Sequence, residues 1–162
     1  MFSSWLSNLE ITQENIEKVA KTFEGFPYLW GGTSSKGMDC SGFTKMVYFT
    51  NGFIIPRDAS QQINAGKSVD ENLDFSDLQK GDLLFFGTKA TSEKKQRVVH
   101  VGIWLGNDKM EFIHSSGNIH LSSMDEKKPN YDAFNKNRYL GSKRYLGVED
   151  EMIIDLKKKL KL

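Results

Sequence analysis

The hydrophobic periodicity of this chain changes once, near residues 80–82, and this change most constrains the fold. Before it, apolar residues recur at the spacing of amphipathic helices; after it, short apolar runs are separated by turn signals. Helices followed by a mostly antiparallel sheet is the element order of an α+β domain, not of alternating βαβ units. With 162 residues, the chain has the length of one domain, which can bury a core without disulfides or a structural metal.

Three helices are expected before the change and five strands after it. The first helix covers 12–23, the second starts at or near Cys40 and ends at 51–52, and a short third helix is capped by Asp58 and reaches 63. The strands are expected at 83–86, 98–105, about 110–115, 119–122 and 144–146. In the second strand, one face is predicted to carry Val99, Val101, Ile103 and Leu105, and the other His100, Gly102 and Trp104.

The two ends of the chain are expected to lie outside the main domain. Residues 1–11 are interpreted as an N-terminal extension, 12–148 as the main domain, and 149–162 as a charged C-terminal helix or tail. The tail is acidic first and rich in lysine last, as a helix dipole prefers; a basic amphipathic helix resting on a membrane or a partner is the alternative. The start lacks the basic residues and apolar run of a secretory signal, although a chain beginning after a removed leader would look the same.

The charge balance and the hydrophobic content argue against three classes of protein. The chain has 22 Lys+Arg and 21 Asp+Glu, a formal net charge of +1. A nucleic-acid partner held by a large positive field is therefore not expected. Hydrophobic residues make up 38% of the chain, which argues against disorder, and no stretch reaches the roughly 18 to 20 apolar residues of a membrane span.

Cys40 is the only cysteine of the chain, so it is either a small buried residue or a nucleophile. Backbone N–H groups at a helix start stabilise a thiolate, and Gly42 leaves the approach to the sulfur open. A base must come from the three histidines. His100 and His114 are polar insertions in two apolar strands, whereas His120 is expected at the surface. We therefore predict Cys40 as nucleophile, His100 as base and His114 as the orienting group; a buried cysteine with structural histidines is the alternative.

Metal and phosphate sites are not indicated. A single cysteine and two histidines separated by 13 intervening residues match none of the short ligand spacings of structural zinc sites. The glycine-rich loop at Gly31-Gly32-Thr33 lacks the Gly-Lys-Ser/Thr ending of a P-loop. We expect no metal and no cofactor.

Six blocks between Thr12 and Gly147 resemble the NlpC-type cell-wall cysteine peptidases. They are PYLWGGT at 27–33, GMDCSGF at 37–43, PRD at 56–58, GDLLFF at 81–86, HVGI at 100–103 and FIHSS at 112–116. The blocks follow the family's order. The resemblance implies a papain-like α+β fold and hydrolysis of the amide bond between γ-linked D-glutamate and a diamino acid, meso-diaminopimelate or L-lysine, in peptidoglycan stem peptides. It implies the same roles for Cys40, His100 and His114, and it places Tyr28 near the oxyanion site.

A narrower resemblance, to the branch that includes dipeptidyl-peptidase VI, comes from the PRDAS block. It implies that Asp58 pairs with the free ammonium of an N-terminal L-alanine, although Asp58 as a helix cap is the alternative and both roles can coexist. Arg57 belongs to the same block, and Asp39 and Ser41 are expected to line the same groove. Members of this branch usually carry SH3-like domains ahead of the catalytic domain, so such domains, or another chain supplying them, are expected partners.

Other functions remain open at the level of sequence. The same fold hosts amidases and acyltransferases, and a catalytically inactive wall-binding module is a third possibility. The resemblance favours a periplasmic, secreted or envelope location, with cytoplasmic recycling of wall peptides as the alternative. The choice between diaminopimelate and lysine is not determined by these residues.

Overall fold

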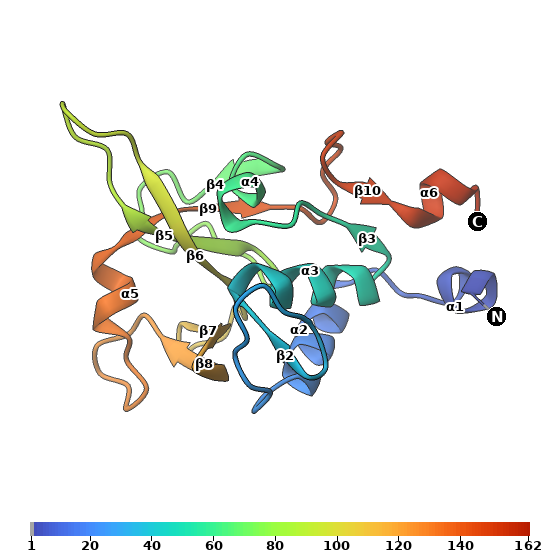
Figure 1. The fold of residues 1–162 in the computed structure, drawn as a ribbon, viewed down its shortest axis with the longest axis horizontal. Coiled ribbons are helices and arrows are strands. Elements are labelled where there is room, and N and C mark those ends of the chain that lie inside the picture. The colour runs from blue at the N-terminus through green and yellow to red at the C-terminus, as the bar shows by residue number, and fades with distance from the viewer. Residues whose placement is uncertain (1) are drawn as a thin grey trace.

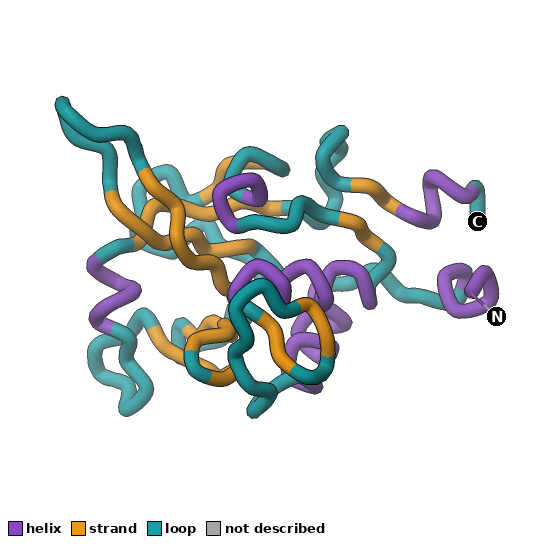
Figure 2. The backbone as a smooth tube through the Cα atoms, in the orientation of Figure 1, coloured by secondary structure: helices purple, strands orange, loops and turns teal. Residues whose placement is uncertain are grey.

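The computed structural model describes residues 2–162, which form short helices around a curved antiparallel sheet (Figures 1 and 2). The helices are α1 (Phe2–Ser7), α2 (Gln13–Thr22), α3 (Cys40–Thr50), α4 (Ala59–Gln62), α5 (Ala133–Asn137) and α6 (Leu156–Leu160). The strands are β1 (Thr33–Ser34), β2 (Gly37–Met38), β3 (Phe53–Ile54), β4 (Lys67–Val69), β5 (Leu83–Thr88), β6 (Arg97–Trp104), β7 (Glu111–Ser116), β8 (Asn118–Ser123), β9 (Tyr139–Arg144) and β10 (Ile154–Asp155).

The main sheet has six strands in the order β4-β9-β5-β6-β7-β8, and every neighbouring pair is antiparallel. Two short pairs, β1 with β2 and β3 with β10, lie outside it. Helices α2 and α3 come before β5 to β8 in the chain, so the predicted α+β order is confirmed.

Both faces of the sheet are covered. One face packs against α2 and α3 in a core that includes Phe43, Val47, Phe85, Val101 and Ile113. The other face carries a smaller aromatic cluster of Phe75, Phe86, Trp104, Phe112 and Tyr139. Because helix α3 contacts β6 and β7 directly, its first residues lie next to the middle of the sheet.

Side-chain caps fix the N-termini of the two long helices, α2 and α3. Thr12 Oγ1 accepts a hydrogen bond of 3.1 Å from Asn15 N at the start of α2, and Asp39 Oδ1 accepts one of 2.7 Å from Gly42 N at the start of α3. Such caps satisfy backbone donors that have no partner within the helix. The cap at Asp39 sets Cys40 as the first residue of α3.

One face assignment in the sequence analysis is wrong. Val99 is 43% exposed instead of lying in the core beside Val101. The pairing of β5 with β6 shifts by one residue between Phe86, which faces His100, and Gly87, which faces Val98. Val99 is therefore the extra residue of a β-bulge, and Val98 packs against the core in its place.

The last predicted strand is also misplaced. Strand β9 ends at Arg144, where the prediction began. Tyr145 leaves the sheet, and its ring packs against Tyr48 at a centroid distance of 5.3 Å, while its hydroxyl donates to Gln62 O at 2.6 Å. The short edge strand β4 was not predicted at all.

The segments predicted to lie outside the domain are tied to it. Leu6 of α1 and Leu156 of α6 are buried, and β10 pairs with β3. Lys157 Nζ donates to Ser7 O at 3.2 Å and to Leu9 O at 2.5 Å, which joins the two ends of the described chain. None of the helices within 2–162 combines the length and the apolar character needed to cross a membrane.

Candidate active site

Cys40 lies at the point where the glycine-rich loop enters α3. Its neighbour Gly42 approaches this loop so closely that an added Cβ would overlap the carbonyl oxygen of Gly32. The backbone N–H of Val101, on β6, is directed at the Cys40 thiol. The thiol is therefore enclosed between the start of a helix and a central strand, and Cys40 is 9% exposed.

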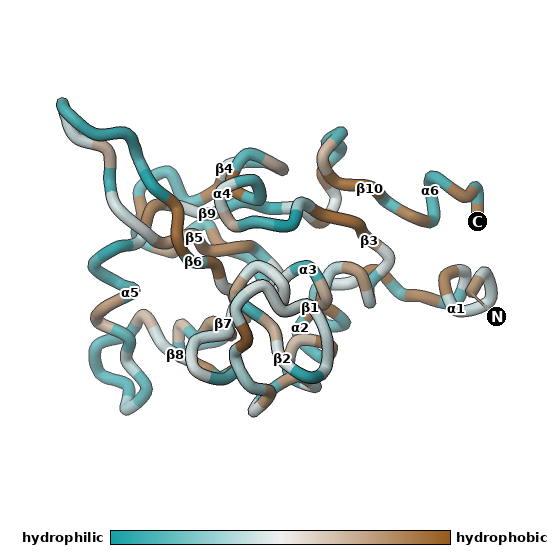
Figure 3. The backbone as a smooth tube through the Cα atoms, in the orientation of Figure 1, coloured by the Kyte–Doolittle hydropathy of each residue, from teal (hydrophilic) through white to brown (hydrophobic). Residues whose placement is uncertain are grey.

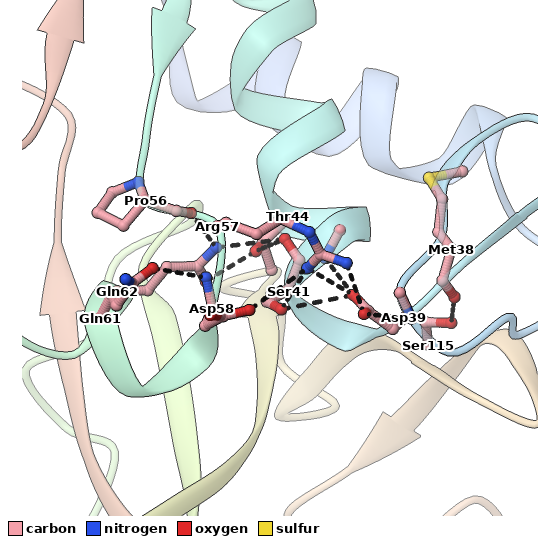
Figure 4. Close-up of polar contacts among 12 residues, drawn as sticks. Met38, Asp39, Ser41, Thr44, Pro56, Arg57, Asp58, Gln61, Gln62 and Ser115 are labelled. Atoms are coloured by element: carbon pink, nitrogen blue, oxygen red, sulfur yellow. Dashed lines mark hydrogen bonds and ion pairs between the residues drawn. The ribbon is translucent and has the colours of Figure 1, made fainter.

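The Asp39 carboxylate organises the loop in front of Cys40 (Figure 4). Arg57 binds it with both terminal nitrogens, at 3.0 Å to Oδ1 and 2.7 Å to Oδ2, and Gly31 N donates to Oδ2 at 3.0 Å. Burial opposes ionisation of Asp39, but Arg57 and the Gly42 N–H outweigh it and lower the pKa of the carboxyl. Ser41 Oγ also accepts from Arg57, at 3.0 Å, so four of the predicted site residues meet at this helix start.

Asp58 lies beside this network but is only loosely joined to it. Its side chain is 64% exposed, and its Oδ1 is 4.0 Å from Arg57 Nη1. It occupies the N-cap position of α4, where Gln61 Oε1 accepts from Asp58 N at 3.1 Å. Because Arg57 is bound mainly to Asp39, the Asp58 carboxylate stays open to a ligand (Figure 4).

The turn before α4 is held by a buried amide that the sequence analysis missed. Gln62 Nε2 donates to Pro56 O at 2.9 Å and to Ser41 O at 3.2 Å, and Gln62 Oε1 accepts from Thr44 Oγ1 at 2.9 Å. A fully buried glutamine with all these partners fixes the position of α4 relative to α3. Gln62 follows the PRDAS block closely, which was the available signal.

His100 and His114 meet on neighbouring strands β6 and β7. The distance between His100 Nε2 and His114 Nδ1 is 2.7 Å, a hydrogen bond whose donor depends on the tautomers. Both rings are buried against aromatic side chains, with Phe86 next to His100 and Phe112 next to His114. Since Nε2 of His100 is occupied by His114, Nδ1 is the nitrogen through which His100 can accept a proton.

Two further groups contact His114, and the sequence analysis missed both. Ser122 Oγ lies 2.9 Å from His114 Nε2, and Asp132 Oδ2 lies 3.9 Å from the same nitrogen. Neither residue belongs to a recognisable motif. His120 was expected at the surface, but it pairs directly with His114 across β7 and β8, and the two ring centroids are 4.6 Å apart.

Burial dominates the protonation of these groups. It raises the pKa of the Cys40 thiol, although the Val101 N–H acts in the opposite direction, so the lowering expected from the helix start does not prevail. It lowers the pKa of His100 to about 3 and that of His114 to about 2. Both Cys40 and His100 are therefore neutral near pH 7.

Tyr28 lies in the loop before β1 and is 38% exposed. Burial of its hydroxyl, and then the negative charge of a Cys40 thiolate and of Asp39, raise the pKa of the phenol. Tyr28 therefore remains a hydrogen-bond donor close to Cys40. Within residues 2–162, no three His, Cys, Asp or Glu side chains are grouped as a metal site.

Comparison with known proteins identifies the family. Residues 25–138 match the NlpC/P60 family. The chain is 46% identical over 104 residues to the gamma-D-glutamyl-L-lysine dipeptidyl-peptidase of Bacillus subtilis, which covers 64% of this chain and 32% of that protein. It is 31% identical over 146 residues to the Escherichia coli murein DD-endopeptidase MepS/murein LD-carboxypeptidase, which covers 90% of this chain and 69% of that protein.

A solved structure agrees with this likeness. An NlpC/P60 family protein from Bacillus cereus has a TM-score of 0.67 and 35% identity, over 83% of this chain and 40% of that one. The match spans only about a third of the length of the B. subtilis relative. Because the family match extends over most of the chain and includes the segments that carry Cys40, His100 and His114, this protein belongs to the NlpC/P60 family of peptidases.

Proposed function

We propose that this protein is a cysteine peptidase that hydrolyses the amide bond between γ-D-glutamate and the diamino acid of peptidoglycan stem peptides. The observation that carries the proposal is the meeting of Cys40, at the start of α3, with β6, the strand whose His100 is hydrogen-bonded to His114. The bond chosen follows the B. subtilis relative, whose name specifies a γ-D-glutamyl-L-lysine dipeptidyl-peptidase.

In the proposed reaction, His100 Nδ1 takes the proton of the Cys40 thiol as the sulfur attacks the γ-carbonyl carbon. The carbonyl oxygen becomes an oxyanion, which accepts hydrogen bonds from the backbone N–H of Cys40 and the Tyr28 hydroxyl. A single donor of this kind contributes about 10² to 10³ in rate. The oxyanion then collapses, the C–N bond breaks, and His100 gives its proton to the departing amine of the diamino acid.

A thioester between Cys40 and the glutamyl γ-carbonyl remains. His100 then removes a proton from a water molecule that attacks this thioester, and the sulfur leaves as the thiol. His114 holds the His100 ring throughout, because it occupies Nε2 and leaves Nδ1 directed at the reaction. The products are the N-terminal dipeptide and a peptide or amino acid that begins with the diamino acid.

Asp58 is the residue proposed to select a free N-terminal L-alanine. Its exposed carboxylate lies next to Arg57, which is bound to Asp39 beside the nucleophile. A substrate ammonium at this position would pair with Asp58, and an acetylated N-terminus would not. The capping role of Asp58 in α4 is compatible with this one, because a cap uses only part of the acceptor capacity of a carboxylate.

The test is the product profile on L-Ala-γ-D-Glu-L-Lys and its meso-diaminopimelate counterpart, each with free and acetylated N-termini, read by mass spectrometry. We expect release of L-Ala-γ-D-Glu, with the free peptide cleaved at least about 10-fold faster, a difference near 1.4 kcal/mol. Asp58→Asn should remove this preference, while Asp108→Asn, an exposed aspartate of the β6–β7 turn, should keep it.

Other outcomes contradict separate parts of the proposal. Equal rates on the free and acetylated peptides would remove Asp58 from substrate selection and leave the cleaved bond unaffected. Separation of an intact stem peptide from muramic acid would indicate an amidase. Cleavage of a cross-link between stems would indicate the activity named for the E. coli relative, and the absence of any product would favour a wall-binding module.

A further inference from the structure

The hydrogen-bonded histidines continue into a chain of polar groups that the reaction above does not use. His114 Nδ1 faces His100, and its Nε2 lies 2.9 Å from Ser122 Oγ. Beyond the serine stands Asp132, whose Oδ2 is 3.9 Å from the same nitrogen. His114 is 1% exposed, Ser122 5% and the Asp132 side chain 16%, so this chain of groups leads from the buried ring toward the surface.

The contact to Ser122 alone does not decide which nitrogen of His114 carries the proton. If Nε2–H donates to Ser122 Oγ, Nδ1 of His114 accepts from His100 Nε2–H, and His100 Nδ1 is free to take a proton from Cys40. If the hydroxyl donates to Nε2 instead, His114 carries its proton on Nδ1 and donates to His100 Nε2. His100 then carries its own proton on Nδ1 and cannot act as a base.

Four charged or titratable groups influence His114. The groups that face it are His100 on β6, His120 on β8, Asp132 before α5 and Arg138 after α5. Asp132 is the only anion among these four. A negative charge near Nε2 favours the tautomer with its proton on that nitrogen, because the N–H dipole then points toward the carboxylate.

The backbone holds Asp132 in this position. Asp132 N donates to Ser123 O at 2.9 Å, next to Ser122 on β8. Its carboxylate caps α5, since Oδ1 accepts from Asn135 N at 2.9 Å and Oδ2 from Asn135 Nδ2 at 2.6 Å. The cap orients the carboxylate and leaves its charge in place.

We propose that Asp132 is a positioning residue of the NlpC/P60 site, which selects the Nε2–H tautomer of His114 and thereby keeps Nδ1 of His100 available to Cys40. Asp132 touches neither substrate nor reacting atoms, and it acts through His114. The inference rests on the proposed role of His100 as the base.

Asp132→Asn is the test, because asparagine caps a helix as well as aspartate does. It removes the charge and keeps one acceptor oxygen for Asn135 N, although the hydrogen bond from Asn135 Nδ2 to Oδ2 is lost. Histidine ring ¹⁵N shifts report the tautomer directly at pH 7, and a chain with three histidines gives three ring systems, of which His120→Gln identifies one. We expect the Nε2–H form of His114 in the native protein and a shift toward the Nδ1–H form in the variant. Asp155→Asn, which alters the aspartate cap of α6, is the matched control. It should leave the tautomer of His114 as it is in the native protein.

Kinetics provide the second readout. With L-Ala-γ-D-Glu-L-Lys as the substrate, kcat of Asp132→Asn should fall about 10- to 100-fold, the loss typical of residues that orient a metal-binding histidine, and KM should stay near the native value. An Nδ1–H tautomer in the native protein, or an unchanged tautomer and kcat in Asp132→Asn, would overturn the inference. If Asp132→Asn unfolds, Asp132→Ser keeps a capping oxygen without the charge. The NMR measurement needs no substrate, so it stays informative even if the cleaved bond is assigned wrongly.

Discussion

At the scale of residues, the proposed chemistry depends on two neutral groups, Cys40 and His100, and on the ion pair of Asp39 with Arg57. Burial keeps Cys40 as a thiol and His100 as an imidazole, so in the proposed mechanism the proton moves between them only when a substrate carbonyl is present. Asp39 is ionised in the same environment because Arg57 binds it with two nitrogens. The charge of Asp39 therefore orders the loop in front of Cys40, and the proposed proton transfer involves only the thiol and the histidine.

The buried histidines make stability depend on pH. Below about pH 6.5, an unfolded chain binds protons at His100 and His114, whereas the folded chain does not until about pH 3 and about pH 2. Protonation thus favours unfolding. As the pH is lowered below about 6.5, the free energy of unfolding should decrease by up to about 1.4 kcal/mol per pH unit for each ring. Urea unfolding at pH 7, 6 and 5, above the range in which most carboxylates titrate, measures this slope.

The double variant His100→Gln/His114→Gln should flatten the slope between pH 6.5 and 5. The half-buried His120 supplies the control, since His120→Gln should leave most of the slope in place. A double variant that keeps the native slope would show that other groups cause it, and that the two rings are not held neutral in the folded protein.

At the scale of elements, the start of α3 is specified by its contact with the glycine-rich loop. Alanine is normally about 1 kcal/mol more favourable than glycine inside a helix. At residue 42 the added methyl would meet Gly32 O and Asp39 Oδ1, so Gly42→Ala should instead destabilise the fold by about 1 to 3 kcal/mol. Thermal unfolding of the native protein and of Gly42→Ala shows whether the substitution lowers or raises the stability. A stabilised Gly42→Ala protein would contradict the close packing of α3 against the loop.

The elements also show what local patterns can and cannot predict. The start of a helix at Cys40 and the placement of two histidines on neighbouring strands followed from spacing, because helix periodicity and strand alternation depend on nearby residues. The bulge at Val99 did not, since it arises from pairing with β5. Ser122 and Asp132 could not be found either, because their importance depends on which ring they face in space.

At the scale of the whole molecule, the site is shared between the two halves of the chain. Helix α3 provides Cys40, and strands β6 and β7 provide the histidines.

The β5–β6 hairpin extends beyond the sheet with a polar tip (Figures 1 and 3), away from the paired ends of the chain. The B. subtilis relative is about three times as long as the matched region. That SH3-like domains or another chain complete the part of the groove that would bind the substrate ammonium therefore stays a prediction.

The role of Cys40 as the nucleophile is tested most directly by Cys40→Ala. The measurement is kcat/KM for release of L-Ala-γ-D-Glu from the free stem peptide, with circular dichroism to establish that the variant is folded. Removal of a nucleophile from a catalytic triad lowers turnover by several orders of magnitude, so we predict a loss of about 10⁴-fold or more in a folded protein. A folded Cys40→Ala protein that retained a substantial fraction of the native kcat/KM would contradict the proposed mechanism.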